Sequence, residues 1–148
     1  MPNDPNHYPP QNMRIRLLGD AGARLKVRRW LPPLLWAGVI LFVTSLPSGL
    51  VPRQLGPFDK VIHFAIYGLF AVLLSRDLSQ ATGRWRAALL AVVIAVAFGA
   101  ADEWHQGFIP GRSTDLADWR ADSIGAAAGA VLFALAHRRR AARLATHR

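Results

Sequence analysis

The sequence predicts an all-α integral membrane protein, a bundle of four transmembrane helices with both termini in the cytoplasm. Four long apolar stretches alternate with short polar ones along the 148 residues, and hydrophobic residues make up 52% of the chain. Lys and Arg are distributed unevenly around these stretches. Cysteine is absent, which excludes disulfides and thiolate chemistry. The net charge of +9 would suggest nucleic-acid binding in a soluble protein, but here it flanks apolar stretches, so we expect no nucleic-acid partner.

Residues 1–29 are expected to form a polar, basic N-terminal segment in the cytoplasm. The first 13 residues contain four prolines and no apolar periodicity, which is typical of a disordered tail. Residues 14–29 carry six Lys or Arg among apolar residues. Two interpretations fit them equally: a basic amphipathic helix on the anionic inner leaflet, or a solvated basic flank.

Residues 30–136 are expected to form the four-helix domain. The first span runs from about Trp30 to Leu46, with Pro32 and Pro33 in its first turn, where a missing N–H costs little. No small-residue cleavage site follows it, which disfavours a signal peptide. The other spans cover about residues 60–78, 85–101 and 116–136. Residues 137–148 are a basic tail, which we place in the cytoplasm.

The orientation follows from the charges. The two ends and the 75–86 loop together hold 14 Lys or Arg, whereas the two other loops and their flanks hold four. The positive-inside rule therefore places both ends in the cytoplasm, which requires an even number of spans. We expect a multi-pass protein of the bacterial cytoplasmic (inner) membrane, with the lipid bilayer as its first partner.

Polar residues of the spans gather at the outer end of the predicted bundle. Helical spacing puts Asp59, His63 and Tyr67 on one face, and Asp102 and His105 on another. Ionisable groups at membrane depth are expensive, so by default they suggest function. The candidate ligand-binding residues are Asp59, Lys60, His63, Tyr67, Asp102, Glu103, His105, Gln106, Arg112 and Asp118.

A purely structural role for these residues stays open with equal weight. Asp115 is suited to capping the fourth helix, and Asp59 favours the start of the second. Lys60 and Arg112 would then pair with carboxylates, and Trp104 and Trp119 would belong to an interfacial aromatic belt.

Metal binding is the less favoured alternative. His63, Asp102 and His105 have suitable ligand atoms, but H-E-x-x-H is absent and the spacing matches no zinc motif. Ser113 lacks a G-x-S-x-G context, and no phosphate-binding glycine loop is present. We therefore expect no cofactor, and catalysis is the less favoured role.

Gly125 and Gly129 form a G-x-x-x-G motif surrounded by alanines in the fourth span. Small residues let helices approach closely. Packing within the bundle is the favoured use of this motif, and a homodimer face is the alternative.

Two blocks, DKVIHFAIYGLFAVLL at 59–74 and DEWHQGFIPGRSTDLADWRADSIGAAAG at 102–129, resemble the two signature blocks of VanZ-like membrane proteins. About ten polar and glycine positions match in order, and Asp122 stands where the family commonly has Asn. The resemblance covers about residues 30–136. It implies a small helical membrane protein, and the family's namesake is linked to low-level resistance to the glycopeptide teicoplanin.

Three hypotheses for function follow. The first is a non-enzymatic protein of the cell envelope that binds a lipid-linked or lipophilic ligand at the polar cluster, in envelope homeostasis or low-level glycopeptide resistance. The second is a membrane-embedded, metal-assisted hydrolase or transferase that acts on a lipid head group through Asp102, Glu103 and His105. The third is a structural or assembly partner that uses the glycine face.

Overall fold

The computed structural model describes the backbone of residues 11–47 and 58–146, and the side chains of residues 28–47 and 58–138. Within these ranges the chain is all-α. Its helices are α1 (Gln11–Thr44), α2 (Phe58–Thr82), α3 (Arg84–Gln106) and α4 (Leu116–Thr146). The tail predicted to be disordered falls mostly on residues 1–10, which lie outside the described residues. The all-α prediction is confirmed.

The first helix is much longer than the predicted first span. α1 begins at Gln11, so Pro32 and Pro33 lie inside the helix and not in its first turn, where we expected them. The apolar stretch identified the part suited to lipid, but it says nothing of where helical hydrogen bonding begins. The preceding residues include Arg, Lys, Leu and Ala, which favour helix. The chain divides into two compact units at Leu31–Pro32, where the paired prolines remove two backbone donors.

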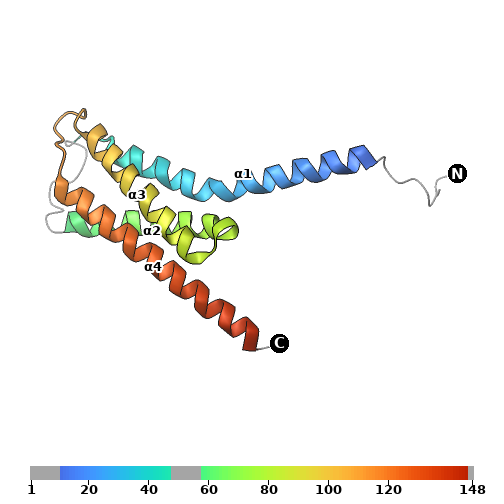
Figure 1. Ribbon diagram of the computed structural model, residues 1–148. Helices are drawn as coiled ribbons and strands as arrows, with labels where there is room; N and C mark the ends of the chain where they lie inside the picture. The colour runs from blue at the N-terminus through green and yellow to red at the C-terminus, as the bar shows by residue number, and fades with distance from the viewer. Residues whose placement is uncertain (1–10, 48–57, 147–148) are drawn as a thin grey trace. The chain divides into compact units, whose positions relative to one another are not determined.

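The second unit, residues 32–148, contains the rest of α1 and the other helices. Here α2, α3 and α4 pack against one another, with the most extensive contacts between α2 and α4 (Figure 1). A Cβ at Gly125 or Gly129 would overlap the backbone carbonyl of Phe64 or Gly68 on α2. The G-x-x-x-G motif therefore lies against α2, and both of its glycines are buried inside the chain.

The core of this unit combines small side chains with a few aromatic ones. Buried alanines let the helices approach, whereas Tyr67 and Phe70 of α2 fill the wider space beside Phe98 of α3. The alanines are Ala71, Ala87, Ala88, Ala91, Ala95, Ala126, Ala130 and Ala134. The last part of α1 contacts α2 through a longer side chain: the Trp36 indole N–H donates to the Ile66 carbonyl at 3.0 Å.

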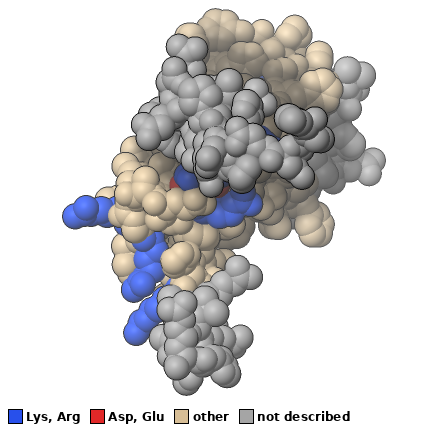
Figure 2. Space-filling view, turned by 90° about the vertical axis from the view of Figure 1, so that its right-hand side faces the viewer, with Lys and Arg blue, Asp and Glu red and all other residues tan. Residues whose placement is uncertain are grey.

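Helices α2 and α3 are each long and apolar enough to cross a membrane, judged by length and composition among the described residues. Only 33% and 39% of their apolar windows are buried, whereas the core helix of a soluble protein would be mostly buried. On the face drawn in Figure 2, most of the described surface is neither acidic nor basic, and Lys and Arg gather toward one side. The outer surface of these helices is therefore largely apolar.

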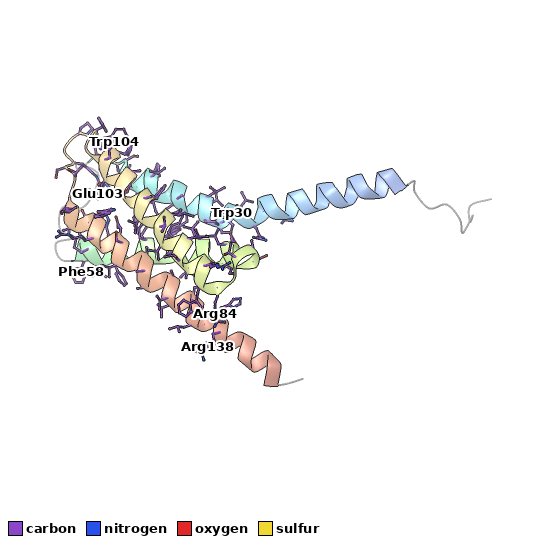
Figure 3. All side chains as sticks on the ribbon, viewed as in Figure 1. Trp30, Phe58, Arg84, Glu103, Trp104 and Arg138 are labelled. Carbon is purple, nitrogen blue, oxygen red and sulfur yellow. The ribbon has the colours of Figure 1, made fainter. Side chains whose placement is uncertain are left out.

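The two ends of the second unit differ in chemistry. Phe58, Glu103 and Trp104 lie at one end, and Arg84 and Arg138 lie at the other (Figure 3). α4 continues to Thr146, ten residues beyond the predicted end of its span, so the predicted basic tail is helical over most of its length. As in α1, the helix extends past the apolar stretch because Arg, Ala and Leu support helix after the apolar residues end.

Candidate functional site

The polar residues at the Phe58 end form two networks. The first joins α2 to α4 and is centred on Lys60. Its ammonium contacts the carboxylates of Asp115 at 2.8 Å and Asp59 at 3.6 Å, and it also pairs closely with Asp118. One cation thus faces three carboxylates, and the proposed pairing of Lys60 with acidic neighbours is what the structure shows.

His63 belongs to the same network, one helical turn after Asp59. Its Nδ1 lies 2.9 Å from Oδ1 of Asp122, which is 1% exposed, and its Nε2 lies 3.9 Å from Oδ1 of Asp118. Because a carboxylate only accepts, Nδ1 carries the hydrogen in this contact and Asp122 fixes the ring. The Nε2 atom is left facing Asp118.

Asp115 caps α4. Its Oδ1 accepts the Ala117 N–H at 2.8 Å, and its own N–H donates to Oε2 of Glu103 at 2.8 Å. The hydrogen bond from Lys60, and then that from the Ala117 N–H, hold the pKa of this carboxyl below its ordinary value. Capping by Asp115 was among the structural roles that the sequence suggested. Asp59 lies in the first turn of α2.

The second network joins α1, α2 and α3 around Asp102, which is 2% exposed. The Thr44 hydroxyl donates to Oδ1 of Asp102 at 2.7 Å. The Tyr67 hydroxyl and the Gln106 amide donate to Oδ2 at 3.4 and 3.3 Å. A buried carboxylate with three donors from three helices is satisfied within the protein, which favours a structural role for Asp102.

Arg112 extends this second network. Its guanidinium donates to the Leu46 carbonyl at 3.1 Å, to the Val43 carbonyl at 3.5 Å and to Oε1 of Gln106 at 3.1 Å. It therefore binds carbonyls at and just after the end of α1, where the next helical turn is missing; the Val43 carbonyl also accepts the Leu46 N–H at 3.3 Å. Pairing of Arg112 with a carboxylate was the structural role that the sequence suggested, but the acceptors that it contacts among the described residues are neutral.

A cavity of about 120 Å³ opens between the last part of α1 and α2. Its walls are apolar, and its polar groups come from both networks. The apolar lining residues are Trp36, Val39, Ile40, Val43, Ile62 and Ile66, and the polar ones are Thr44, Asp59, His63, Tyr67 and Arg112. Helix spacing could not predict this cavity, because half of its wall comes from α1, where the sequence showed no polar pattern apart from Thr44.

Three of the predicted site residues could hold a metal ion together. Ligand atoms of Asp59, His63 and Asp118 lie within 4.8 Å of one another. Of the favoured candidates from the sequence, His63, Asp102 and His105, this set contains His63; it also contains Asp59, whose carboxylate is a suitable ligand type. The ammonium of Lys60 already supplies a positive charge to both aspartates, so a metal ion would have to displace it.

Glu103 and His105 do not line the cavity between α1 and α2. Glu103 joins the α4 cap through Oε2, while its Oε1 is buried with no hydrogen-bond partner among the described residues. His105, in the last turn of α3, has a buried Nδ1 that likewise lacks a partner in the described part. Trp104 and Phe108 are 70% and 68% exposed and pack edge to face, as an interfacial aromatic pair would.

Comparison with known proteins identifies one relationship. Searches of curated proteins and of solved structures gave no match. The model of the VanZ/LLP1 family matches residues 19–137. This range includes the last part of α1, the residues of both networks and the lining of the cavity between α1 and α2. The match extends the resemblance in the 59–74 and 102–129 blocks to most of the chain. The chain belongs to the VanZ/LLP1 family.

Proposed function

We propose that this protein crosses the bacterial cytoplasmic membrane four times, with both termini inside, and binds a lipophilic or lipid-linked envelope ligand in the cavity between α1 and α2. The observation that carries the proposal is the lining of this cavity, an apolar wall with charged groups beside it. Such a lining suits a molecule with a hydrocarbon part and a polar part.

The exposed apolar surface supports membrane insertion. Large side chains on all four helices point outward, among them Phe42 at 68%, Leu89 at 66% and Leu132 at 65% exposure. In water a continuous surface of this kind would drive aggregation, whereas in lipid it is favourable. The apolar α2 and α3 and the basic residues at one end of the second unit add to this support.

The size of the cavity bears on what it could hold. Its volume of about 120 Å³ is close to that of an engineered cavity of about 150 Å³ that binds benzene. The cavity therefore suits a segment of an acyl or prenyl chain, with the rest of the ligand outside. Teicoplanin carries an acyl chain, and lipid-linked cell-wall intermediates carry a prenyl chain, so a role in glycopeptide resistance or envelope homeostasis is consistent with this binding mode.

The test fills the cavity without changing a side chain of either network. Val43 lines the cavity and is 43% exposed, so Val43→Phe should block the ligand while leaving packing intact. Val93→Phe is the matched control, since Val93 is 58% exposed on α3 and does not line the cavity. Each variant is expressed in a deletion strain, and sensitivity to teicoplanin and to inhibitors of lipid-linked intermediates is measured together with membrane abundance.

We expect Val43→Phe to lose complementation at normal abundance and Val93→Phe to retain it. His63→Gln should behave like Val43→Phe, because it keeps volume and a polar group but not the imidazole. Asp102→Asn should instead lower abundance and phenotype together, since it disturbs a structural carboxylate. Full complementation by both Val43→Phe and His63→Gln would refute the proposal.

An enzymatic role is the second candidate, and it rests on Asp59, His63 and Asp118. In that case the metal ion would act on a lipid head group. His63, whose Nδ1 is held by Asp122, would present Nε2 to the ion. Metal analysis of the same purified protein decides between the two. One metal ion per chain that disappears in His63→Gln would favour the enzyme, and its absence would favour the binding protein.

A further inference from the structure

A second cavity, of about 420 Å³, lies between the end of α3 and the start of α4. None of its lining residues lines the cavity beside α1. The lining residues are Ala100, Glu103, Thr114, Asp115, Leu116 and Trp119. Two of them are carboxylates and none is basic, so the chemistry of this cavity differs from that of the proposed ligand site.

Glu103 is the unusual residue in this cavity. It is only 8% exposed, and Oε2 accepts the Asp115 N–H, but buried Oε1 has no hydrogen-bond partner among the described residues. A buried carboxylate oxygen without a donor is costly. Lys60 is engaged with Asp59, Asp115 and Asp118, so within the described ranges Oε1 is left without a donor that a bound ligand could supply.

We propose that this second cavity binds the primary ammonium group of an amine-bearing lipid head group. The ammonium would donate to Oε1 of Glu103, where a charge-assisted hydrogen bond is stronger than a neutral one. Trp119 supplies an aromatic wall suited to a cation, and its indole is fixed by donation to the Val96 carbonyl at 3.1 Å. Leu116, 58% exposed at the rim, offers an apolar surface to the start of the lipid chains.

The position of the cavity agrees with a lipid source for the amine. Glu103 and the exposed Trp104 lie at the same end of the second unit (Figure 3). An exposed tryptophan of this kind sits at the level of lipid head groups. The proposal depends on membrane insertion, but it does not depend on ligand binding in the cavity beside α1.

The test compares two lipids with the same acyl chains. Binding of short-chain phosphatidylethanolamine and phosphatidylglycerol to the full chain in a non-ionic detergent is measured by native mass spectrometry. We expect the ethanolamine lipid to bind about tenfold more tightly, the effect of one charge-assisted hydrogen bond. Free ethanolamine, added as competitor, shows whether the amine alone is sufficient or whether the lipid chains are needed.

Two variants should abolish this preference. Glu103→Gln removes the charge but keeps an oxygen for the Asp115 N–H, and Ala100→Leu fills the cavity from an exposed position on α3. Ala97→Leu, also exposed on α3 but outside the cavity lining, is the control and should keep the preference. Equal binding of the two lipids by the unmodified chain, or a preference that survives both Glu103→Gln and Ala100→Leu, would overturn the proposal and leave water as the partner of Oε1.

Discussion

His63 shows how one side chain of α2 is held by two carboxylates of α4. Asp122 holds its Nδ1, so the ring orientation is fixed by a residue that is itself buried. Asp122 therefore accepts from His63 and leaves Nε2 facing Asp118.

Asp115→Asn should destabilise the protein in a pH-dependent way. The pKa of Asp115 lies below the ordinary value of 3.8, because Lys60 and the Ala117 N–H favour the charged form. A lowered pKa contributes stability above the ordinary value, and this contribution disappears as the pH falls through the folded-state value.

Melting temperatures in detergent from pH 7 down into strong acid, well below the ordinary pKa of 3.8, check this prediction. The unmodified chain should melt higher than Asp115→Asn at neutral pH, and the difference should shrink toward zero in strong acid. A constant difference across that range would contradict the prediction, since it would show that the charge of Asp115 is not the source of the difference.

Helical spacing predicted which site residues share a face, but it did not predict their partners. The i, i+4 spacing of Asp59 and His63 placed them together correctly, since both belong to one helix. Two of the partners of Arg112 could not be predicted, because they are the backbone carbonyls of Val43 in α1 and of Leu46 just after it. Glu103 was assigned to the ligand cluster, yet it faces a separate cavity, which depends on how α3 and α4 pack.

At the scale of elements, glycine brings α4 against α2. Gly125 and Gly129 are four residues apart, so both face the same side of α4, where they meet the Phe64 and Gly68 backbone. The sequence predicted this use of G-x-x-x-G because alanines surround it. Close approach of these helices also places Asp118 and Asp122 beside Lys60 and His63, so the packing motif positions the polar network.

Gly129→Ala should destabilise the bundle by about 1–3 kcal/mol, the usual cost of overpacking. A Cβ there would meet the Gly68 backbone, which cannot move aside as a side chain can. Gly38→Ala on α1 is the matched control, since nothing lies within 4 Å of its added Cβ. Thermal melting in detergent should show a lower midpoint for Gly129→Ala and an unchanged or higher one for Gly38→Ala. Equal midpoints would mean that the two helices are farther apart than described.

The helix limits show why apolar stretches were only a partial guide. Each stretch lies within one helix, so the number and order of helices in the described ranges agree with the prediction. The limits of α1 and α4 differ because basic residues such as Arg138 continue a helix as readily as leucine does. Hydropathy predicts which part of a helix suits lipid, whereas backbone hydrogen bonding decides where the helix ends.

At the scale of the molecule, the distribution of charge along the sequence and the structure both distinguish two chemically different ends of the second unit. Arg84 and Arg138 mark one end of the second unit, and the polar networks, the two cavities and Trp104 mark the other (Figure 3). Fourteen of the 18 Lys and Arg fall in segments assigned to the inner side by their sequence. Membrane orientation would then expose both proposed binding sites on the outer side, where envelope ligands and head groups of the outer leaflet are found.

Reporter fusions test this orientation. Green fluorescent protein joined after Arg148 should fluoresce, because it folds in the cytoplasm, and alkaline phosphatase joined after Ser113 should be active, because it needs an oxidising outer compartment. The reciprocal fusions, phosphatase after Arg148 and fluorescent protein after Ser113, should both be silent. The reason is the excess of Lys and Arg at the Arg84 and Arg138 end, which resists translocation. An active phosphatase at Arg148 would place the C-terminus outside. The number of spans would then be odd, or the orientation would be reversed, and neither proposed site would lie on the outer face.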